Sequence, residues 1–261
     1  MTTLFSGLEI SLKIAGKTLL NNVSLAIPAA QITVLMGPNG AGKTLLLKVL
    51  AGMLSPHEGR LEGADGLPLL LGDEKEWALW RTWVPSSQTL PFDFKVIDLV
   101  QMGRLSLHQG FPGATDLKAS LEALRKLGIE HLKDRSFNSL SRGEQTKVDI
   151  ARAIAHTASL LILDEPFANL DIDSQLHLSK VLRSLVKEGR TVLLSHHDLY
   201  SIPRLADSVA FIKQGQLIAA GPKADVFIPS LIHQVFGVQV TMCQHPKGQT
   251  LLVTDMQDMM E

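Results

Sequence analysis

The eight residues 37–44, with the sequence GPNGAGKT, constrain the fold more than any other part of this chain. They follow a continuous apolar run, QITVLM (31–36), which is typical of a strand that is buried on both faces. They lead into TLLLKVLAG (44–52), whose apolar spacing predicts a helix that ends at Gly52. A glycine-rich turn between a buried strand and a helix, within a chain that alternates strands and helices, indicates an α/β domain with a mostly parallel sheet.

The same eight residues fit the pattern G-x-x-x-x-G-K-[ST], in which backbone N–H groups and a helix N-terminus surround phosphate groups. Lys43 would reach the terminal phosphates, and the Thr44 hydroxyl would bind Mg²⁺. A glycine-rich turn without a ligand is the alternative, but the flanking strand and helix favour phosphate binding. We therefore expect a ligand's phosphate chain to contact the whole segment, Gly37, Pro38, Asn39, Gly40, Ala41, Gly42, Lys43 and Thr44.

Two carboxylates end a second apolar run, LLILDEP (160–166). Either could be a helix cap, but beside a phosphate loop a metal and water site is favoured. Successive strand residues point to opposite sides, so Asp164 and Glu165 cannot share one role. We expect Asp164 to hold Mg²⁺ and Glu165 to act as the general base that orients the attacking water.

Three further polar segments are weaker signals when each is taken alone. SHHD (195–198) follows an apolar strand, and its histidines could donate to a phosphate or could simply lie in an exposed loop. Gln88 lies where the chain enters a helical region. In LSRGEQTK (140–147), Ser141 and Glu144 form a capping box for the helix that follows, but a cap does not require Gly143, which costs about 1 kcal/mol in a helix.

The order of elements predicts one domain in several parts. LEISLKI (8–14) and TLLNNVSLAI (18–27) read as antiparallel strands, with Asn21-Asn22 and Pro28-Ala29-Ala30 near their ends. Residues 89–156 read as a helical insertion, after which strand and helix alternate again. SVAFIKQGQLIAAGP (208–222) predicts a hairpin that turns at Gln214-Gly215, and the last forty residues predict a short helix and a hairpin around HPKG (245–248). We expect 1–88 and 157–261 to form the core and 89–156 a helical subdomain.

Composition narrows the classes of function. Lys plus Arg is 25 and Asp plus Glu is 26, so the net charge of −1 argues against a nucleic-acid binder that relies on a positive field. The single cysteine excludes an intramolecular disulfide. The N-terminus does not read as a signal peptide, and the apolar runs are too short to cross a bilayer, so we expect any membrane role to depend on another chain.

Together, GPNGAGKT, Gln88, LSRGEQ, LLILDEP, ANLD (168–171) and SHHD resemble the ATPase subunits of ABC transporters in order and spacing. The resemblance covers residues 5–225 and implies a phosphate-loop α/β core, an antiparallel β-region and a helical subdomain. It also implies a homodimer in which each ATP lies between the phosphate loop of one chain and the signature segment Ser141, Arg142, Gly143 and Glu144 of the other. Gln88 would bind Mg²⁺ as well as ATP, His197 rather than His196 would contact the γ-phosphate because it directly precedes Asp198, and Asp171 would lie in the dimer seam.

Three positions depart from the family pattern. Arg142 replaces the first glycine of the signature, and Ala168 stands where serine is commoner. The early β-region lacks the aromatic residue that stacks on adenine, so Leu12 or Ile14 is expected to pack there instead.

VIDLVQMGRLSLH (96–108) and the tail VFGVQVTMCQHPKGQTLLV (235–253) are similar to the ATPases of siderophore, haem and cobalamin importers. The resemblance thus implies an ATP-hydrolysing importer subunit on the cytoplasmic side of the inner membrane, with separate permease subunits and, indirectly, a periplasmic or extracellular substrate-binding protein. The ATPase of another importer or of an exporter, or a non-transport ABC ATPase, stays an alternative.

Overall fold

The computed structural model describes residues 2–69, 79–87, 92–107, 113–244 and 250–254. The chain divides into two compact units, one of residues 1–71 and 193–261 and the other of residues 72–192. Strand β7 (Thr191–His196) begins in the second unit and ends in the first, so the chain itself carries the strand across this division. We describe each unit separately.

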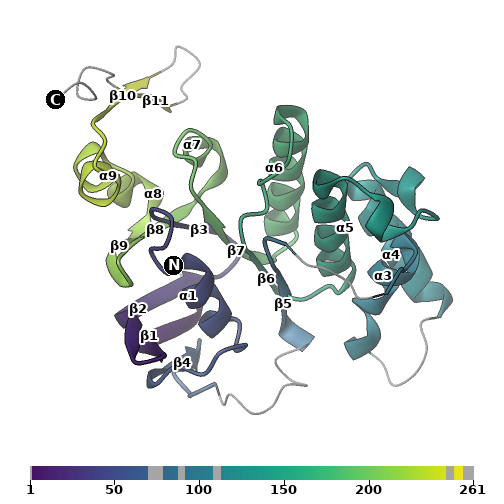
Figure 1. Ribbon diagram of the computed structural model, residues 1–261, viewed down its shortest axis with the longest axis horizontal. Coiled ribbons are helices and arrows are strands. Elements are labelled where there is room, and N and C mark those ends of the chain that lie inside the picture. The colour runs from purple at the N-terminus through teal and green to yellow at the C-terminus, as the bar shows by residue number, and fades with distance from the viewer. Residues whose placement is uncertain (1, 70–78, 88–91, 108–112, 245–249, 255–261) are drawn as a thin grey trace. The chain divides into compact units, whose positions relative to one another are not determined.

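The first unit contains an antiparallel sheet of order β2-β1-β4, formed by β1 (Thr3–Ile14), β2 (Lys17–Pro28) and β4 (Glu58–Gly63) (Figure 1). The expected end at Asn21-Asn22 is wrong, because β2 continues through both residues. Asn22 has a φ of 50°, and the β1–β2 register shifts between Ile10 and Leu12. The asparagines therefore mark an irregularity inside the strand, as a bulge does, and the strand does not end there.

The same unit holds the strand that precedes the phosphate loop. All five residues of β3 (Ile32–Met36) are buried, as the apolar run predicts, and β3 pairs in parallel with β8 (Ser208–Lys213). Strand β9 (Gln216–Pro222) pairs antiparallel with β8 through the predicted turn, where Gln214 and Gly215 both have positive φ. Helix α1 (Lys43–Leu50) buries Leu46, Leu47, Val49 and Leu50.

Short elements complete the first unit. They are α7 (Ile202–Leu205), α8 (Lys223–Val226), α9 (Pro229–Phe236), β10 (Val240–Gln244) and β11 (Thr250–Thr254). The antiparallel pairing of β10 with β11 confirms the C-terminal hairpin, although its HPKG turn lies outside the described residues.

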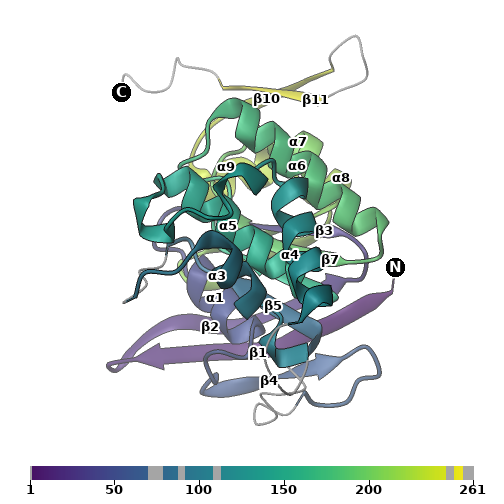
Figure 2. The same ribbon diagram turned by 90° about the vertical axis from the view of Figure 1, so that its right-hand side faces the viewer.

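The second unit combines a parallel strand pair with helices. Strand β5 (Arg81–Val84) pairs with β6 (Leu160–Leu163), and every residue of β6 is buried. The helices are α3 (Val96–Met102), α4 (Ala114–Lys126), α5 (Arg142–Ala155) and α6 (Ile172–Lys187), with single 3₁₀ turns at Leu105–Leu107, Glu130–Leu132 and Phe137–Ser139. Figures 1 and 2 both show α3, α4 and α5 packed side by side, which agrees with the helical region expected from the sequence.

Candidate functional site

The phosphate-loop segment connects β3 to α1, as the sequence predicts. Gly42 is the N-cap of α1 and has a φ of 103°, a conformation that glycine adopts without the steric cost of a β-carbon. The first turn of α1 contains no acidic residue. Its N–H groups and the positive end of the helix dipole are therefore not opposed by a carboxylate, which suits an anion such as phosphate.

Lys43 is bent back over this loop. Its Nζ donates to the main-chain oxygens of Gly37, at 2.8 Å, and Pro38, at 3.1 Å, and the residue is only 6% exposed. The ammonium is thus held against the segment expected to surround the phosphates. Thr44 is exposed, so its hydroxyl is accessible to a ligand.

The two histidines at the end of β7 have different environments. His196 is buried, with a pKa lowered to about 4 mainly by burial, with smaller contributions from His197 and from Lys43. Strand β7 lies next to β3 in the sheet, so the end of β7 lies near the loop that follows β3. His197 follows on the surface, with its ring centroid 5.7 Å from that of His196, so it is the histidine of this pair with an accessible ring.

The paired carboxylates follow β6 in the second unit. Asp164 is 2% exposed, and its N–H donates to the Val84 oxygen at 2.9 Å, which extends the β5–β6 pairing. Glu165 is half-buried and has a φ of 49°, in the left-handed region. Such a conformation costs about 1–3 kcal/mol in a residue with a β-carbon and is common where a side chain must be aimed at a functional site. Because β6 ends at Leu163, neither carboxylate belongs to the strand, and the expectation that strand alternation separates their side chains does not apply.

The signature segment begins α5, and the predicted capping box is confirmed. The Ser141 N–H and hydroxyl both donate to Glu144 Oε2 at 2.8 Å, and the Glu144 N–H donates to Ser141 Oγ at 3.3 Å. Hydrogen bonds from Ser141 lower the pKa of Glu144. A phosphate that binds Ser141 must therefore compete with Glu144 for the hydroxyl proton, a constraint that the sequence pattern does not reveal.

Packing within the chain itself explains why position 143 is glycine, which the sequence pattern did not indicate. A β-carbon at this position would lie 2.7 Å from the main-chain oxygen of Asn169, which belongs to the ANLD segment and has a φ of 62°. Real β-carbons do not come so close to a backbone oxygen. Close packing of the signature on the turn after β6 therefore requires glycine here, independently of any ligand.

Two other expected site residues lie on the surface of the second unit. Asp171 is the N-cap of α6, where it accepts a hydrogen bond from the Ser174 N–H at 2.7 Å, and hydrogen bonds with Ser174 lower its pKa. Arg142 is exposed at the first helical position of α5, where the positive end of the helix dipole disfavours a cation. Both side chains are exposed on the surface of this unit.

The remaining expectations have mixed outcomes. Gln88 lies outside the described residues. Leu12 is only 3% exposed, whereas Ile14, at the end of β1, is 46% exposed, so of these two residues Ile14 has more apolar surface to offer an adenine ring.

The structure adds a pocket of about 120 Å³ that the sequence did not indicate. It is lined by Pro85, Ser86, Ser87, Arg142, Gln145, Thr146, Asp149 and Asn169. Burial raises the pKa of Asp149 to about 6, and Arg152, 3.7 Å away, opposes this increase. The signal in the sequence was an acid at a position that the apolar spacing of α5 assigns to the buried face.

Comparison with known proteins relates these features to one family. The profile described as ABC transporter matches residues 20–168. A hemin import ATP-binding protein, HmuV, of Thermobifida fusca is 34% identical over 252 residues, which cover 97% of this chain and 88% of the relative. HmuV of Gloeobacter violaceus is 35% identical over 245 residues, covering 91% and 89%.

Solved structures agree on the fold. A chain of an ABC transporter assigned to the metal-chelate type, in an inward-facing conformation, gives a TM-score of 0.82 at 24% identity and covers 98% of both chains. The cbiO1 protein of Clostridium perfringens, described as part of the ABC transporter complex cbiONQ, gives 0.75 at 26% identity and covers 91% of this chain and 97% of its own.

Proposed function

Because this chain belongs to the ABC transporter family, we propose that it is the ATP-hydrolysing subunit that powers import of a metal chelate of the haem class through separate membrane subunits. The observation that carries this proposal is the identity of about one third with hemin import ATP-binding proteins along nearly the whole chain. ATP hydrolysis is characteristic of the family, and the loop at 37–44 and the acids after β6 are the groups that it needs.

In this proposal the phosphate loop binds ATP and the pair of acids serves hydrolysis. The buried Lys43 ammonium neutralises the terminal phosphates, and the N-terminus of α1 adds its dipole. Glu165 accepts the proton of the attacking water, because a half-buried carboxylate within hydrogen-bond reach can act as a general base. His197, whose ring is accessible beside the loop, donates to the γ-phosphate.

The available side chains suit Mg²⁺, which prefers oxygen ligands and keeps much of its shell as water and substrate phosphate. Thr44 and Asp164 supply such oxygens, and Gln88 would supply another. The residues described by the structure contain no group of three or more His, Cys, Asp or Glu side chains that could hold a metal by themselves. When bound, Mg²⁺ neutralises charge that develops on the phosphates.

We also propose that two copies share their ATP sites. The exposed Ser141, Arg142 and Asp171 would meet the second copy, while Gly143 and Glu144 shape the segment that faces its nucleotide. Removal of the γ-phosphate would then weaken the dimer, because a ligand shifts an equilibrium only through its different affinity for the two states.

The proposed organisation of the chain follows from these roles. Residues 1–88 and 157–261 would bind and hydrolyse ATP, and residues 89–156 would carry the signature as a helical subdomain. Within the described ranges no helix is both long enough and apolar enough to cross a membrane. By its similarity to hemin import ATP-binding proteins, we propose that the chain associates with permease subunits on the cytoplasmic face of the inner membrane, and that a substrate-binding protein acts through those subunits.

Purification of the native complex tests this proposal. Extraction from membranes with a mild detergent should recover an integral membrane protein together with this chain. After reconstitution with that partner, ATP hydrolysis should rise when hemin is supplied with its binding protein. If only another metal chelate stimulates hydrolysis, haem is excluded as the substrate but the importer assignment stands. Stimulation by DNA or ribosomes, without a membrane partner, would refute the importer assignment.

A further inference from the structure

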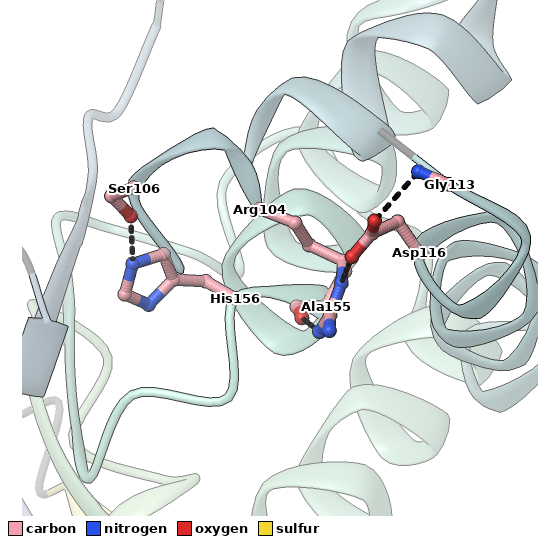
Figure 3. Close-up of polar contacts among 6 residues, drawn as sticks. All are labelled: Arg104, Ser106, Gly113, Asp116, Ala155 and His156. Atoms are coloured by element: carbon pink, nitrogen blue, oxygen red, sulfur yellow. Dashed lines mark hydrogen bonds and ion pairs between the residues drawn. The ribbon is translucent and has the colours of Figure 1, made fainter. Parts of the chain in front are cut away.

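We propose that Arg104 is a positioning residue for the signature segment Ser141–Glu144, acting from the opposite end of α5 without touching the nucleotide. The proposal concerns a set of contacts that we call the Arg104 junction, in which Arg104, Asp116, Ala155 and His156 are buried. It consists of Arg104, Ser106, Gly113, Asp116, Ala155 and His156 (Figure 3). The inference rests on the shared ATP site proposed above.

The contacts of Arg104 join three separate pieces of the second unit. Its Nε donates to Asp116 Oδ1 at 2.7 Å, and its guanidinium donates through a terminal nitrogen to the Ala155 oxygen at 2.5 Å (Figure 3). Asp116 Oδ2 in turn accepts from the Gly113 N–H at 2.8 Å, which caps α4. One side chain therefore ties the turn after α3 to the start of α4 and to the last residue of α5.

A second contact links the same segments. Ser106 Oγ lies 2.8 Å from Nε2 of His156, the C-cap residue of α5. The positive charge of Arg104 also lies near the negative end of the α5 dipole, where a cation is favoured. Both contacts therefore act on the C-terminal end of this helix.

The backbone next to Arg104 approaches α5 equally closely. A β-carbon at Gly103 would lie 2.6 Å from the Arg152 oxygen and 2.7 Å from the Arg152 Cγ. The turn after α3 therefore lies directly against the last turn of α5. Contact of main chain with main chain leaves little freedom for one to move without the other.

Stability alone is a poor explanation for this ion pair. The side chains of Arg104 and Asp116 are 10% and 5% exposed, and well-packed apolar residues are often as stable as a buried ion pair or more so. What an apolar pair cannot supply is a directed hydrogen bond to the Ala155 oxygen. The geometry thus favours a role in fixing position.

Helix α5 can transmit a displacement of its C-terminus to the signature segment at its N-terminus. It is 14 residues long, or about 20 Å, and runs without proline from Arg142 to Ala155. The capping box stabilises its first turn, and the Arg104 junction holds its C-terminus. A displacement at Ala155 therefore moves Ser141 with it.

Mixed dimers provide the test, because the signature serves the ATP of the other copy. Both copies carry Glu165→Gln to retain ATP, and one also carries Lys43→Ala, so that the only competent phosphate loop faces the signature of the Lys43→Ala copy. Arg104→Lys placed in the Lys43→Ala copy should weaken retention of labelled ATP roughly tenfold or more, because small misplacements of binding groups are costly. The same substitution in the other copy should change retention less than about twofold, since its signature faces the disabled loop.

Ser141→Arg, placed in each copy in turn, separates the two proposals. Suppose that the effect of Ser141→Arg on ATP retention depends on which copy carries it, but that Arg104→Lys lowers retention equally from either copy, or from neither. The positioning role is then refuted, and the shared site survives. If Ser141→Arg shows no dependence on placement, the shared site fails, and the inference fails with it. If Arg104→Lys only destabilised the copy that carries it, ATP retention would not be lowered specifically when that copy is the Lys43→Ala copy.

A second variant covers the case in which Arg104→Lys does not fold. Arg104→Met combined with Asp116→Leu replaces the ion pair by apolar side chains of similar size, so the variant should still fold. It lacks the bond to Ala155, so ATP retention should still fall when it is placed in the Lys43→Ala copy. Unchanged retention there would refute the positioning role.

Discussion

The main-chain oxygen of Asn169 lies 2.7 Å from where a β-carbon on Gly143 would be, so the signature and the turn after β6 are packed in direct backbone contact. Gly143→Ala must displace one of them, because a backbone oxygen cannot yield as a flexible side chain can. We expect a loss of about 1–3 kcal/mol in the free energy of unfolding and a clear fall in ATP hydrolysis. Chemical denaturation and phosphate release measure the two effects.

Gly221→Ala is the matched control, since its β-carbon would meet only a methyl group of Val226, at 3.3 Å. If Gly143→Ala and Gly221→Ala lose the same free energy of unfolding, the contact with the Asn169 oxygen is not the cause of the loss in Gly143→Ala.

Lys43→Met tests the phosphate loop. It keeps the aliphatic stem but removes an ammonium held at 2.8 Å from the Gly37 oxygen. Loss of a charge-assisted hydrogen bond should weaken ATP affinity by about 10–100-fold, which titration with a fluorescent ATP analogue would measure. Lys48→Met, in the last turn of α1, should leave the affinity unchanged. An unchanged affinity in Lys43→Met would contradict the assignment of the loop.

Glu165→Gln tests the general base. Glutamine has the same size and can adopt the same backbone conformation, but it cannot accept a proton, so kcat should fall by about 10²–10⁴-fold while ATP still binds. Size-exclusion chromatography with ATP should then show a stable dimer. Glu122→Gln, an exposed acid on α4, serves as the control. Normal turnover in Glu165→Gln would remove Glu165 from this role.

Asp149→Asn should change how stability depends on pH. The pKa of Asp149 is raised from 3.8 to about 6 in the folded chain, so between these values the unfolded chain releases the proton more readily. Stability from this carboxyl is therefore lost as pH rises from about 4 to 6, a shift of two units being worth about 3 kcal/mol. The free energy of unfolding of the variant should be closest to that of the parent near pH 4 and should exceed it by up to about 3 kcal/mol at pH 7.

Urea denaturation at both pH values checks this prediction, with the exposed Asp173→Asn as control. A difference between Asp149→Asn and the parent that is the same at pH 4 and pH 7 would show that burial does not control the charge of Asp149.

His196→Gln should act in the opposite direction. The pKa of His196 falls from 6.5 to about 4 on folding, mainly because of burial, so below pH 6.5 the unfolded chain binds the proton more readily. Stability is then lost as pH falls from 6.5 to 4, by about 3 kcal/mol in total. His196→Gln should remove this loss, which thermal unfolding at pH 7 and pH 5 would reveal. An acid sensitivity equal to that of the parent would assign the loss to other groups.

Local features of this protein could be read from neighbouring residues. The strand, loop and helix around Lys43, the cap formed by Ser141 and Glu144, and the turn at Gln214-Gly215 each depend on residues within a few positions, and each was predicted correctly. Strands β4 and β5 were missed, because EGRLEG and RTWV are short and lack a clear apolar alternation.

The sequence by itself determined which chemical groups the chain carries and in what order, because phosphate loops, caps and tight turns are dictated by backbone conformations that only certain residues adopt. Only the tertiary structure decided which distant groups meet. It brought Asn169 against Gly143, placed Arg104 between Asp116 and Ala155, and buried His196 while leaving His197 exposed. These contacts join residues far apart in the chain, and their geometry follows from how the helices and strands pack, which no local pattern records.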